Sequence, residues 1–256
     1  MLNVTPKEAQ TLLKQNKYDD PQFFNKYSQM ARSIGGLEAA GEWHAFRAML
    51  PDLSAKEVLD LGCGFGWHCR YAREQGARSV LGVDLSEKML ARARAATADP
   101  AIAYRRLAIE DIDFPAAAFD VVLSSLALHY VERFDRVCQK IRHSLTPGGH
   151  FVFSVEHPIF TARAAQDWHY GPQGEKLHWP VDDYQSEGAR NARFLDEDVI
   201  KYHRTLANYL NTLIASGLRI TQIAEPVPPP EMLAQQPDYR HELRRPMFLL
   251  VATVRD

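Results

Sequence analysis

The run VLDLGCGFG at residues 58–66 constrains the fold most strongly. Its apolar beginning is typical of a buried parallel strand, and the glycines at alternate positions predict a tight turn after it. Because glycine has no Cβ, the backbone of such a turn can approach a ligand closely. A helix predicted over residues 65–75 would direct its first N–H groups into the same space. The segment therefore predicts a strand, a ligand-binding turn and a helix.

A second acidic strand end supports a cofactor site. Residues 79–84 (SVLGVD) predict a strand ending in Asp84, where a doubly wound sheet places an acid that accepts hydrogen bonds from a ribose. The spacing G-x-G-x-G differs from the dinucleotide fingerprint G-x-G-x-x-G, and Asp60 would repel a diphosphate. These features disfavour an NAD-type dehydrogenase and favour a zwitterionic or cationic ligand.

Composition limits the classes of partner. The chain has 256 residues, a formal charge of −2 and no strongly basic segment, so nucleic acid is an unexpected partner. Its three cysteines form no disulfide framework and show no zinc spacing, which predicts a reducing compartment and no metal. Residues 1–20 lack a signal-peptide core, and no apolar run is long enough to cross a bilayer. We expect a soluble cytoplasmic protein that binds no membrane, and its oligomeric state stays open.

Strands and helices alternate from residue 56 to residue 153, which predicts an α/β fold with a doubly wound, mostly parallel sheet. The predicted strands cover residues 57–61, 79–83, 102–106, 119–124 and 149–155, followed later by 218–225 and 247–254. The predicted helices cover residues 65–75, 86–95, 132–144 and 205–216, with a short turn at 126–130. A proline-rich link at residues 226–230 is expected to run along the surface.

Two further segments are predicted to cover the sheet. Residues 1–50 show helical periodicity and predict two or three helices. Residues 158–204 are rich in aromatic side chains and predict an inserted cap with a hairpin near residues 184–202. Such aromatic groups favour a lid that excludes water from a pocket.

Four short motifs resemble those of the class I S-adenosylmethionine-dependent methyltransferases. They are DLGCG at residues 60–64, Asp84, FDVVLSS at residues 119–125 and LTPGG at residues 145–149. Together they look most similar to the type 11 branch, whose members act on small molecules. The resemblance implies a Rossmann-like sheet of seven strands, closed by an antiparallel pair, in a methyltransferase domain over residues 51–256. It also implies S-adenosyl-L-methionine as cofactor and S-adenosyl-L-homocysteine as product.

The resemblance assigns roles to individual residues. Gly62 and Gly64 would line the methionine moiety, Asp84 would hold the ribose, and Leu85 and Met89 would flank the adenine. The sequence departs from the family at Ala108, where relatives often carry an acid, so Glu110, Asp111 or the Ile109 backbone would contact the adenine instead. The cofactor-binding residues implied in this way are Tyr27, Asp60, Gly62, Cys63, Gly64, Asp84, Leu85, Met89, Ile109, Glu110, Ser124 and His129.

Methyl transfer is an in-line displacement that depends mainly on alignment, although a hydroxyl or ammonium acceptor must also lose a proton. Histidine is suited to take that proton. His157, at the end of the fifth strand beside Glu156, is the first candidate, with a purely structural corner as the alternative. His129 is the second candidate and is also expected to shape the pocket.

The predicted substrate pocket consists of Phe160, Tyr184, His203 and Arg204. Arg204 would either anchor an anionic acceptor or pair with an acid at residues 196–198. The predicted function is methyl transfer from S-adenosylmethionine to a small-molecule acceptor whose nucleophilic atom stays open. The alternative from another class is a protein that binds S-adenosylmethionine without turnover, as a sensor or a partner subunit.

Overall fold

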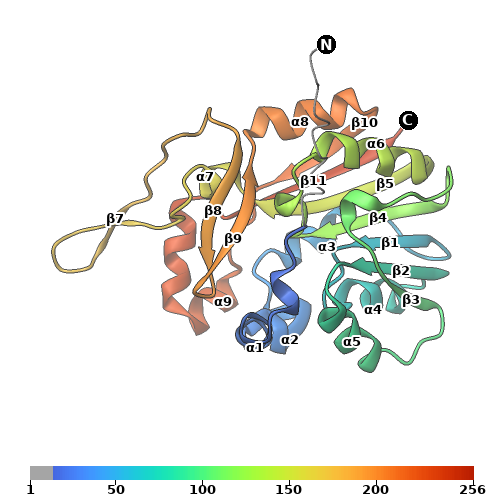
Figure 1. The fold of residues 1–256 in the computed structure, drawn as a ribbon, viewed down its shortest axis with the longest axis horizontal. Helices are drawn as coiled ribbons and strands as arrows, with labels where there is room; N and C mark the ends of the chain where they lie inside the picture. The colour runs from blue at the N-terminus through green and yellow to red at the C-terminus, as the bar shows by residue number, and fades with distance from the viewer. Residues whose placement is uncertain (1–13) are drawn as a thin grey trace, which may run out of the picture.

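A computed structural model describes residues 14–256 and contains a seven-stranded sheet in the order β10-β11-β5-β4-β1-β2-β3 (Figure 1). The strands β1 to β5 are parallel, whereas β11 runs antiparallel to both β5 and β10. The strands are β1 (Glu57–Leu61), β2 (Ser79–Asp84), β3 (Ile102–Arg106), β4 (Phe119–Ser125), β5 (Leu145–Glu156), β10 (Leu218–Ala224) and β11 (Phe248–Arg255). The predicted doubly wound sheet with a closing antiparallel pair is confirmed.

Helices cover both faces of this sheet. On one face, α6 (Phe134–Ser144) and α8 (Leu206–Ala215) pack against side chains such as Leu59. On the other face, α3 (Trp43–Met49), α4 (Trp67–Glu74) and α5 (Glu87–Ala95) share a core with Val58. Because consecutive strand residues point to opposite faces, the apolar residues of β1 and β4 supply both cores.

The order of strands reverses between β1 and β4, since β1 leads to β2 on one side while β4 and β5 lie on the other. In an open α/β sheet, this reversal opens a crevice beyond the carboxyl ends of the strands, and ligands bind there. The glycine turn after β1 lies at this point.

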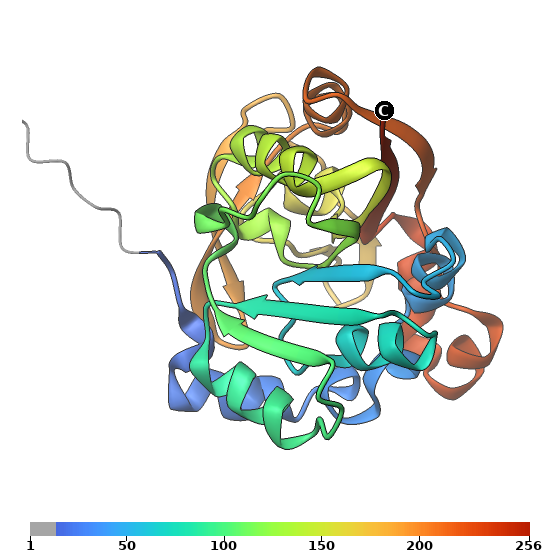
Figure 2. The ribbon, with the colours of Figure 1, turned by 90° about the vertical axis from the view of Figure 1, so that its right-hand side faces the viewer.

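Most of the N-terminal cover lies at the carboxyl ends of the strands (Figures 1 and 2), and its described part has three α-helices, as predicted, together with two short 3-10 turns. Residues 1–13, part of the predicted cover and of the segment tested for a signal peptide, lie outside the described residues. Asp20 caps α1 by accepting hydrogen bonds from the Gln22 and Phe23 amides. The elements are η1 (Lys17–Asp19), α1 (Pro21–Ser28), α2 (Ala31–Gly35), η2 (Gly36–Ala39) and α3.

The cap contains the predicted hairpin, formed by β8 (Gly188–Phe194) and β9 (Glu197–His203). Figure 2 shows this hairpin beside the N-terminal cover. Gln15 joins the two by exchanging hydrogen bonds with the Ile200 backbone, and Lys26 donates to the Leu195 carbonyl at 3.1 Å. The rest of the cap is α7 (Pro158–Thr161), β6 (His169–Tyr170) and β7 (Lys176–His178).

Some short elements differ from the predictions. The proline-rich link leads into α9 (Pro230–Gln235) and η5 (Pro237–Arg244), because proline is tolerated in the first turn of a helix. Two short turns follow β3 and β4 at the site edge of the sheet: η3 (Ile109–Asp111) was not predicted, whereas η4 (Leu128–Tyr130) confirms the short turn predicted at 126–130. Within residues 14–256, no helix has the length and apolar character that a bilayer crossing requires.

Candidate functional site

The glycine turn after β1 combines left-handed backbone with close packing. Gly62 has φ of +73° and Gly64 has φ of +51°. A Cβ added to Gly62 would lie 2.4 Å from the Ala127 Cβ, so this position has no room for a side chain. A Cβ on Gly64 would meet nothing within 4 Å, which leaves the backbone of this residue open to a ligand.

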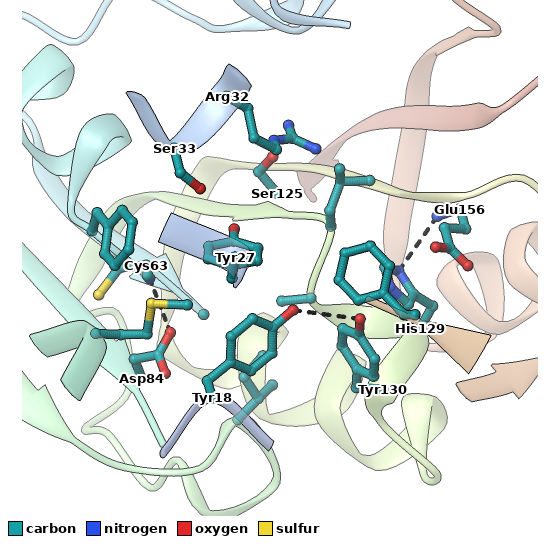
Figure 3. A pocket seen from close by; sticks show the side chains of 18 of the residues that line it. Tyr18, Tyr27, Arg32, Ser33, Cys63, Asp84, Ser125, His129, Tyr130 and Glu156 are labelled. Carbon is teal, nitrogen blue, oxygen red and sulfur yellow. Dashed lines mark hydrogen bonds between the residues drawn. The ribbon is translucent and has the colours of Figure 1, made fainter. Parts of the chain in front are cut away.

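Asp84, the last residue of β2, is held against this turn. Its Oδ2 accepts a hydrogen bond from the Gly64 amide at 2.9 Å (Figure 3). Its Oδ1 accepts one from the Ser86 amide at 2.9 Å. Burial raises the pKa of the Asp84 carboxyl. An ionised carboxylate has about four acceptor sites, so two remain for ligand hydroxyls.

A cavity of about 440 Å³ extends from the glycine turn and Asp84 to Glu156, beneath the N-terminal cover (Figure 3). It brings together residues of the turn after β1 and of the carboxyl ends of β2, β4 and β5, which are far apart in the sequence. The predicted site residues that line it are Tyr27, Gly62, Cys63, Gly64, Asp84, Leu85, Met89, Ile109, Glu110, His129 and Phe160. Ala108 also lines it, so the departure from the family pattern lies on the cavity wall.

Two residues predicted to bind the cofactor, Asp60 and Ser124, do not line the cavity. Their side chains have structural roles instead. Asp60 is buried and accepts a hydrogen bond from the Cys69 thiol at 3.3 Å, while burial raises its pKa to about 7. The Ser124 hydroxyl donates to the Leu61 carbonyl at 2.9 Å. Because strand side chains alternate, the next residue, Ser125, reaches the cavity instead.

Two tyrosines that the sequence prediction missed stand opposite each other in the cavity. The hydroxyl oxygens of Tyr18 and Tyr130 are 3.4 Å apart (Figure 3), and the Tyr18 ring meets the Tyr27 ring edge-on at 5.1 Å. Burial raises the pKa of both Tyr18 and Tyr130, so their phenols stay protonated near neutral pH. Tyr130 follows β4 closely, so its place at the carboxyl end of the sheet could have been predicted from the sequence.

A buried ion pair forms the far wall of the cavity. Lys201 is 2% exposed and its ammonium donates to Glu156 Oε1 at 2.6 Å. Gln166 bridges the two, donating to Glu156 Oε2 at 2.9 Å and accepting from Lys201 at 2.8 Å. Burial opposes ionisation of Glu156, but the Lys201 ammonium and the hydrogen bonds from Lys201 and Gln166 hold the pKa of Glu156 below the ordinary value. No local pattern around Lys201 predicts this pairing, because β9 and β5 meet only in the folded chain.

His129 lines the cavity next to this pair. Its Nδ1 accepts a long hydrogen bond of 3.4 Å from the Glu156 amide, and its ring lies 4.4 Å from the Tyr130 ring. Burial lowers the pKa of His129 to about 4, so the ring is neutral near pH 7. With Nδ1 as acceptor, the tautomer assigned from this bond carries its proton on Nε2.

His157, the first predicted base, does not line the cavity. Its Nδ1 accepts from the Ile159 amide at 3.0 Å and caps α7, while its Nε2 bonds Glu225 Oε1 at 2.8 Å. Both ring nitrogens are therefore occupied within the protein, as in the structural corner considered as the alternative. Glu156, predicted to orient His157, pairs with Lys201 instead.

Three predicted substrate residues, Tyr184, His203 and Arg204, also lie away from the cavity. The His203 ring bonds the Thr161 hydroxyl and the Tyr184 carbonyl, both at 2.9 Å. Arg204 is buried and donates to the carbonyls of Val131 and Glu132, rather than to an acid at 196–198. His203 thus joins parts of the cap to one another, and Arg204 joins the end of the cap to the segment after η4. Only Phe160 of the predicted substrate set reaches the cavity.

Comparison with known proteins identifies the family. Residues 59–153 match the model of a methyltransferase domain. The solved structure of an S-adenosylmethionine-dependent methyltransferase from Mesorhizobium loti is 49% identical and covers 86% of this chain and all of its own, with a TM-score of 0.81. A Listeria monocytogenes protein assigned to the same class is 53% identical over 86% of this chain and 99% of its own, with a TM-score of 0.82. The chain belongs to the S-adenosylmethionine-dependent methyltransferases.

Membership of this family shows an enzyme that uses S-adenosylmethionine, and the cavity suits that cofactor. The open backbone at Gly64 leaves room for the methionine part, and Asp84 keeps acceptor sites for ribose hydroxyls. Leu85, Met89 and Ile109 supply apolar surface on the same wall. The methyltransferase is also 39% identical over 111 residues to a malonyl-[acyl-carrier protein] O-methyltransferase of Enterobacter lignolyticus, a match that covers 43% of each chain.

Proposed function

We propose that this methyltransferase acts on a small-molecule acceptor held in the half of the cavity that lies between Tyr18 and Lys201. The observation that supports this proposal is that the N-terminal cover and the cap are joined directly above that half. Gln15 exchanges hydrogen bonds with the Ile200 backbone, and Lys26 reaches the Leu195 carbonyl. An acceptor that the cover and the cap enclose must be small enough to enter the cavity whole or to insert its reactive end.

Relatives of this chain have other kinds of acceptor in their names, namely malonyl-[acyl-carrier protein] and tRNA U34. The match to the first covers 43% of this chain, and the match to the second covers 62%. With a formal charge of −2, the chain has no excess of positive charge with which to hold tRNA phosphates. These points favour a small acceptor over either macromolecule.

The acceptor half offers hydrogen-bond donors without net charge. Glu156 and Lys201 neutralise each other, and the phenols of Tyr18 and Tyr130 keep their protons. The neutral His129 ring carries its remaining N–H on Nε2. This wall is suited to a polar acceptor whose oxygen or nitrogen lone pairs accept such bonds.

When bound, S-adenosylmethionine supplies an electrophilic methyl group on a sulfonium sulfur. The residues of the wall would then orient the acceptor in line with that group, which accounts for most of the acceleration in such a displacement. The Glu156 amide occupies the lone pair of His129 Nδ1. In this tautomer His129 can therefore donate a hydrogen bond through Nε2 but cannot act as a base. We therefore assign His129 and Tyr130 to orientation of the acceptor.

The experiment follows a tritiated methyl group. The purified enzyme is incubated with methyl-labelled S-adenosylmethionine and, separately, with a low-molecular-mass metabolite extract, an acyl carrier protein fraction and total tRNA. Label is expected in the metabolite extract only. Label in the carrier protein or the tRNA alone would overturn the proposal, and the Asp84→Ala variant should lower labelling strongly when S-adenosylmethionine is kept below saturation.

A further inference from the structure

Two buried polar groups on the cavity wall have no hydrogen-bond partner within the described residues. They are the Ser33 hydroxyl, in a residue that is 2% exposed, and the Trp67 indole N–H. Figure 3 shows the Ser33 hydroxyl pointing into the cavity. Buried polar groups in folded proteins are nearly always paired, so two such groups on one cavity wall indicate a ligand that pairs with them.

A cation and a helix terminus lie with these groups. Arg32 precedes Ser33 on α2 and also lines the cavity. Trp67 is the first residue of α4, whose unpaired amides and positive dipole end face the glycine turn. The two segments are in contact, because a Cβ on Gly36 would lie 2.8 Å from the Trp67 ring.

Arg32 is the cation of this corner and is paired with Glu42, so an anion would bind through the remaining N–H donors and not through a net positive charge. One Arg32 nitrogen bonds the buried carboxylate of Glu42, and the guanidinium keeps other N–H donors in its fork. Burial lowers the pKa of His68, which also lines the cavity, to about 3, so this ring is neutral. A planar carboxylate matches an arginine fork supplemented by a hydroxyl and an indole N–H.

We propose that Arg32, Ser33 and Trp67 form a carboxylate subsite that binds the α-carboxylate of the methionine part of the cofactor. The glycine turn supports this occupant, because the open backbone of Gly64 lies three residues before Trp67. The N-terminal cover thus belongs to the cofactor site, and not only to the acceptor site. This inference rests on the cofactor class and is independent of the acceptor proposed above.

The test compares two ligands by calorimetric titration. S-adenosylhomocysteine carries the carboxylate, and its decarboxylated analogue keeps the ammonium, thioether and adenosine. We expect Ser33→Ala to weaken S-adenosylhomocysteine binding about ten-fold, as for one lost bond to a charged group, and to change binding of the analogue less than about two-fold. Arg32→Lys keeps a cation for Glu42 but loses the fork, and it should show the same selectivity for the carboxylate.

Ser28→Ala is the matched control, since the Ser28 hydroxyl is also buried without a partner but does not line the cavity. It should leave both affinities at the wild-type level. Equal weakening of both ligands by Ser33→Ala would overturn the proposal, because the effect would then not depend on the carboxylate. Unchanged affinity for both ligands would overturn it as well and would leave a carboxylate of the acceptor as the group to test. Thermal melting of each variant checks that it is folded.

Discussion

The Asp84 carboxylate accepts a hydrogen bond from the Gly64 amide at 2.9 Å, and this bond joins the end of β2 to the glycine turn after β1. Asp84, which would hold the ribose, is therefore positioned by Gly64, which would line the methionine part. Since the Ser86 amide donates to the other oxygen, the carboxylate is held in place before any ligand binds. Such preorganisation reduces the entropy lost on binding.

Asp84→Asn should weaken binding of S-adenosylhomocysteine by about 1.5–3 kcal/mol, the usual worth of hydrogen bonds to a charged group. The amide keeps the shape of the side chain, but its NH₂ cannot accept the bonds that one carboxylate oxygen accepts. Calorimetry on the variant and the wild type measures the difference. An affinity equal to the wild type would contradict the assignment of Asp84 to the ribose.

Lys201→Met should lower the free energy of unfolding by about 3–5 kcal/mol, because it leaves the buried Glu156 carboxylate without its cation. Adding Glu156→Gln should recover a large part of this loss, since the amide carries no charge to be compensated. Urea unfolding of the two single variants and the double variant gives the coupling. Additive losses would show that the two residues do not act as a pair.

His129 should make the stability of the enzyme depend on pH. The folded state lowers its pKa from 6.5 to about 4, so the unfolded state binds more protons between these values and stability falls as the pH falls through this window. The wild type should lose about 2–3 kcal/mol more than His129→Asn between pH 7.5 and 4.5. Burial also shifts the pKa values of Asp60 and His68, but both proteins keep these residues. The difference between the two proteins in urea unfolding therefore reports His129. If the free energies of unfolding of the two proteins changed equally with pH, the predicted role of His129 would be wrong.

His157→Ala should lower stability by about 1–2 kcal/mol, because α7 loses its cap and Glu225 loses its partner. Turnover per folded molecule should stay near the wild-type rate, since the ring lies outside the cavity. The measurement pairs thermal melting with the methyl-transfer assay at a temperature where both proteins are folded. A large fall in turnover without a fall in stability would restore the catalytic role.

Where sequence prediction succeeded, the determinants were local. The apolar run and glycines of residues 58–66, together with Asp84, predicted the turn, the acid and the parallel sheet, and the structure has all of them. The hairpin predicted near residues 184–202 from the composition of the cap is present as β8 and β9. Each of these follows from side-chain volume, backbone freedom or hydrogen bonding over a few residues.

The acceptor half of the site depended on contacts that no local pattern contains. His157 stands where a base was expected, yet a corner of the fold turns its ring toward Glu225. Lys201 follows Glu156 by 45 residues and becomes its partner only when the cap folds over the end of β5. The sequence by itself determined the parallel sheet, the glycine turn and the acid at the end of β2, because short-range geometry specifies them. Only the tertiary structure decided which side chains face the acceptor, because burial and long-range pairing select them after the cover and the cap close over the sheet.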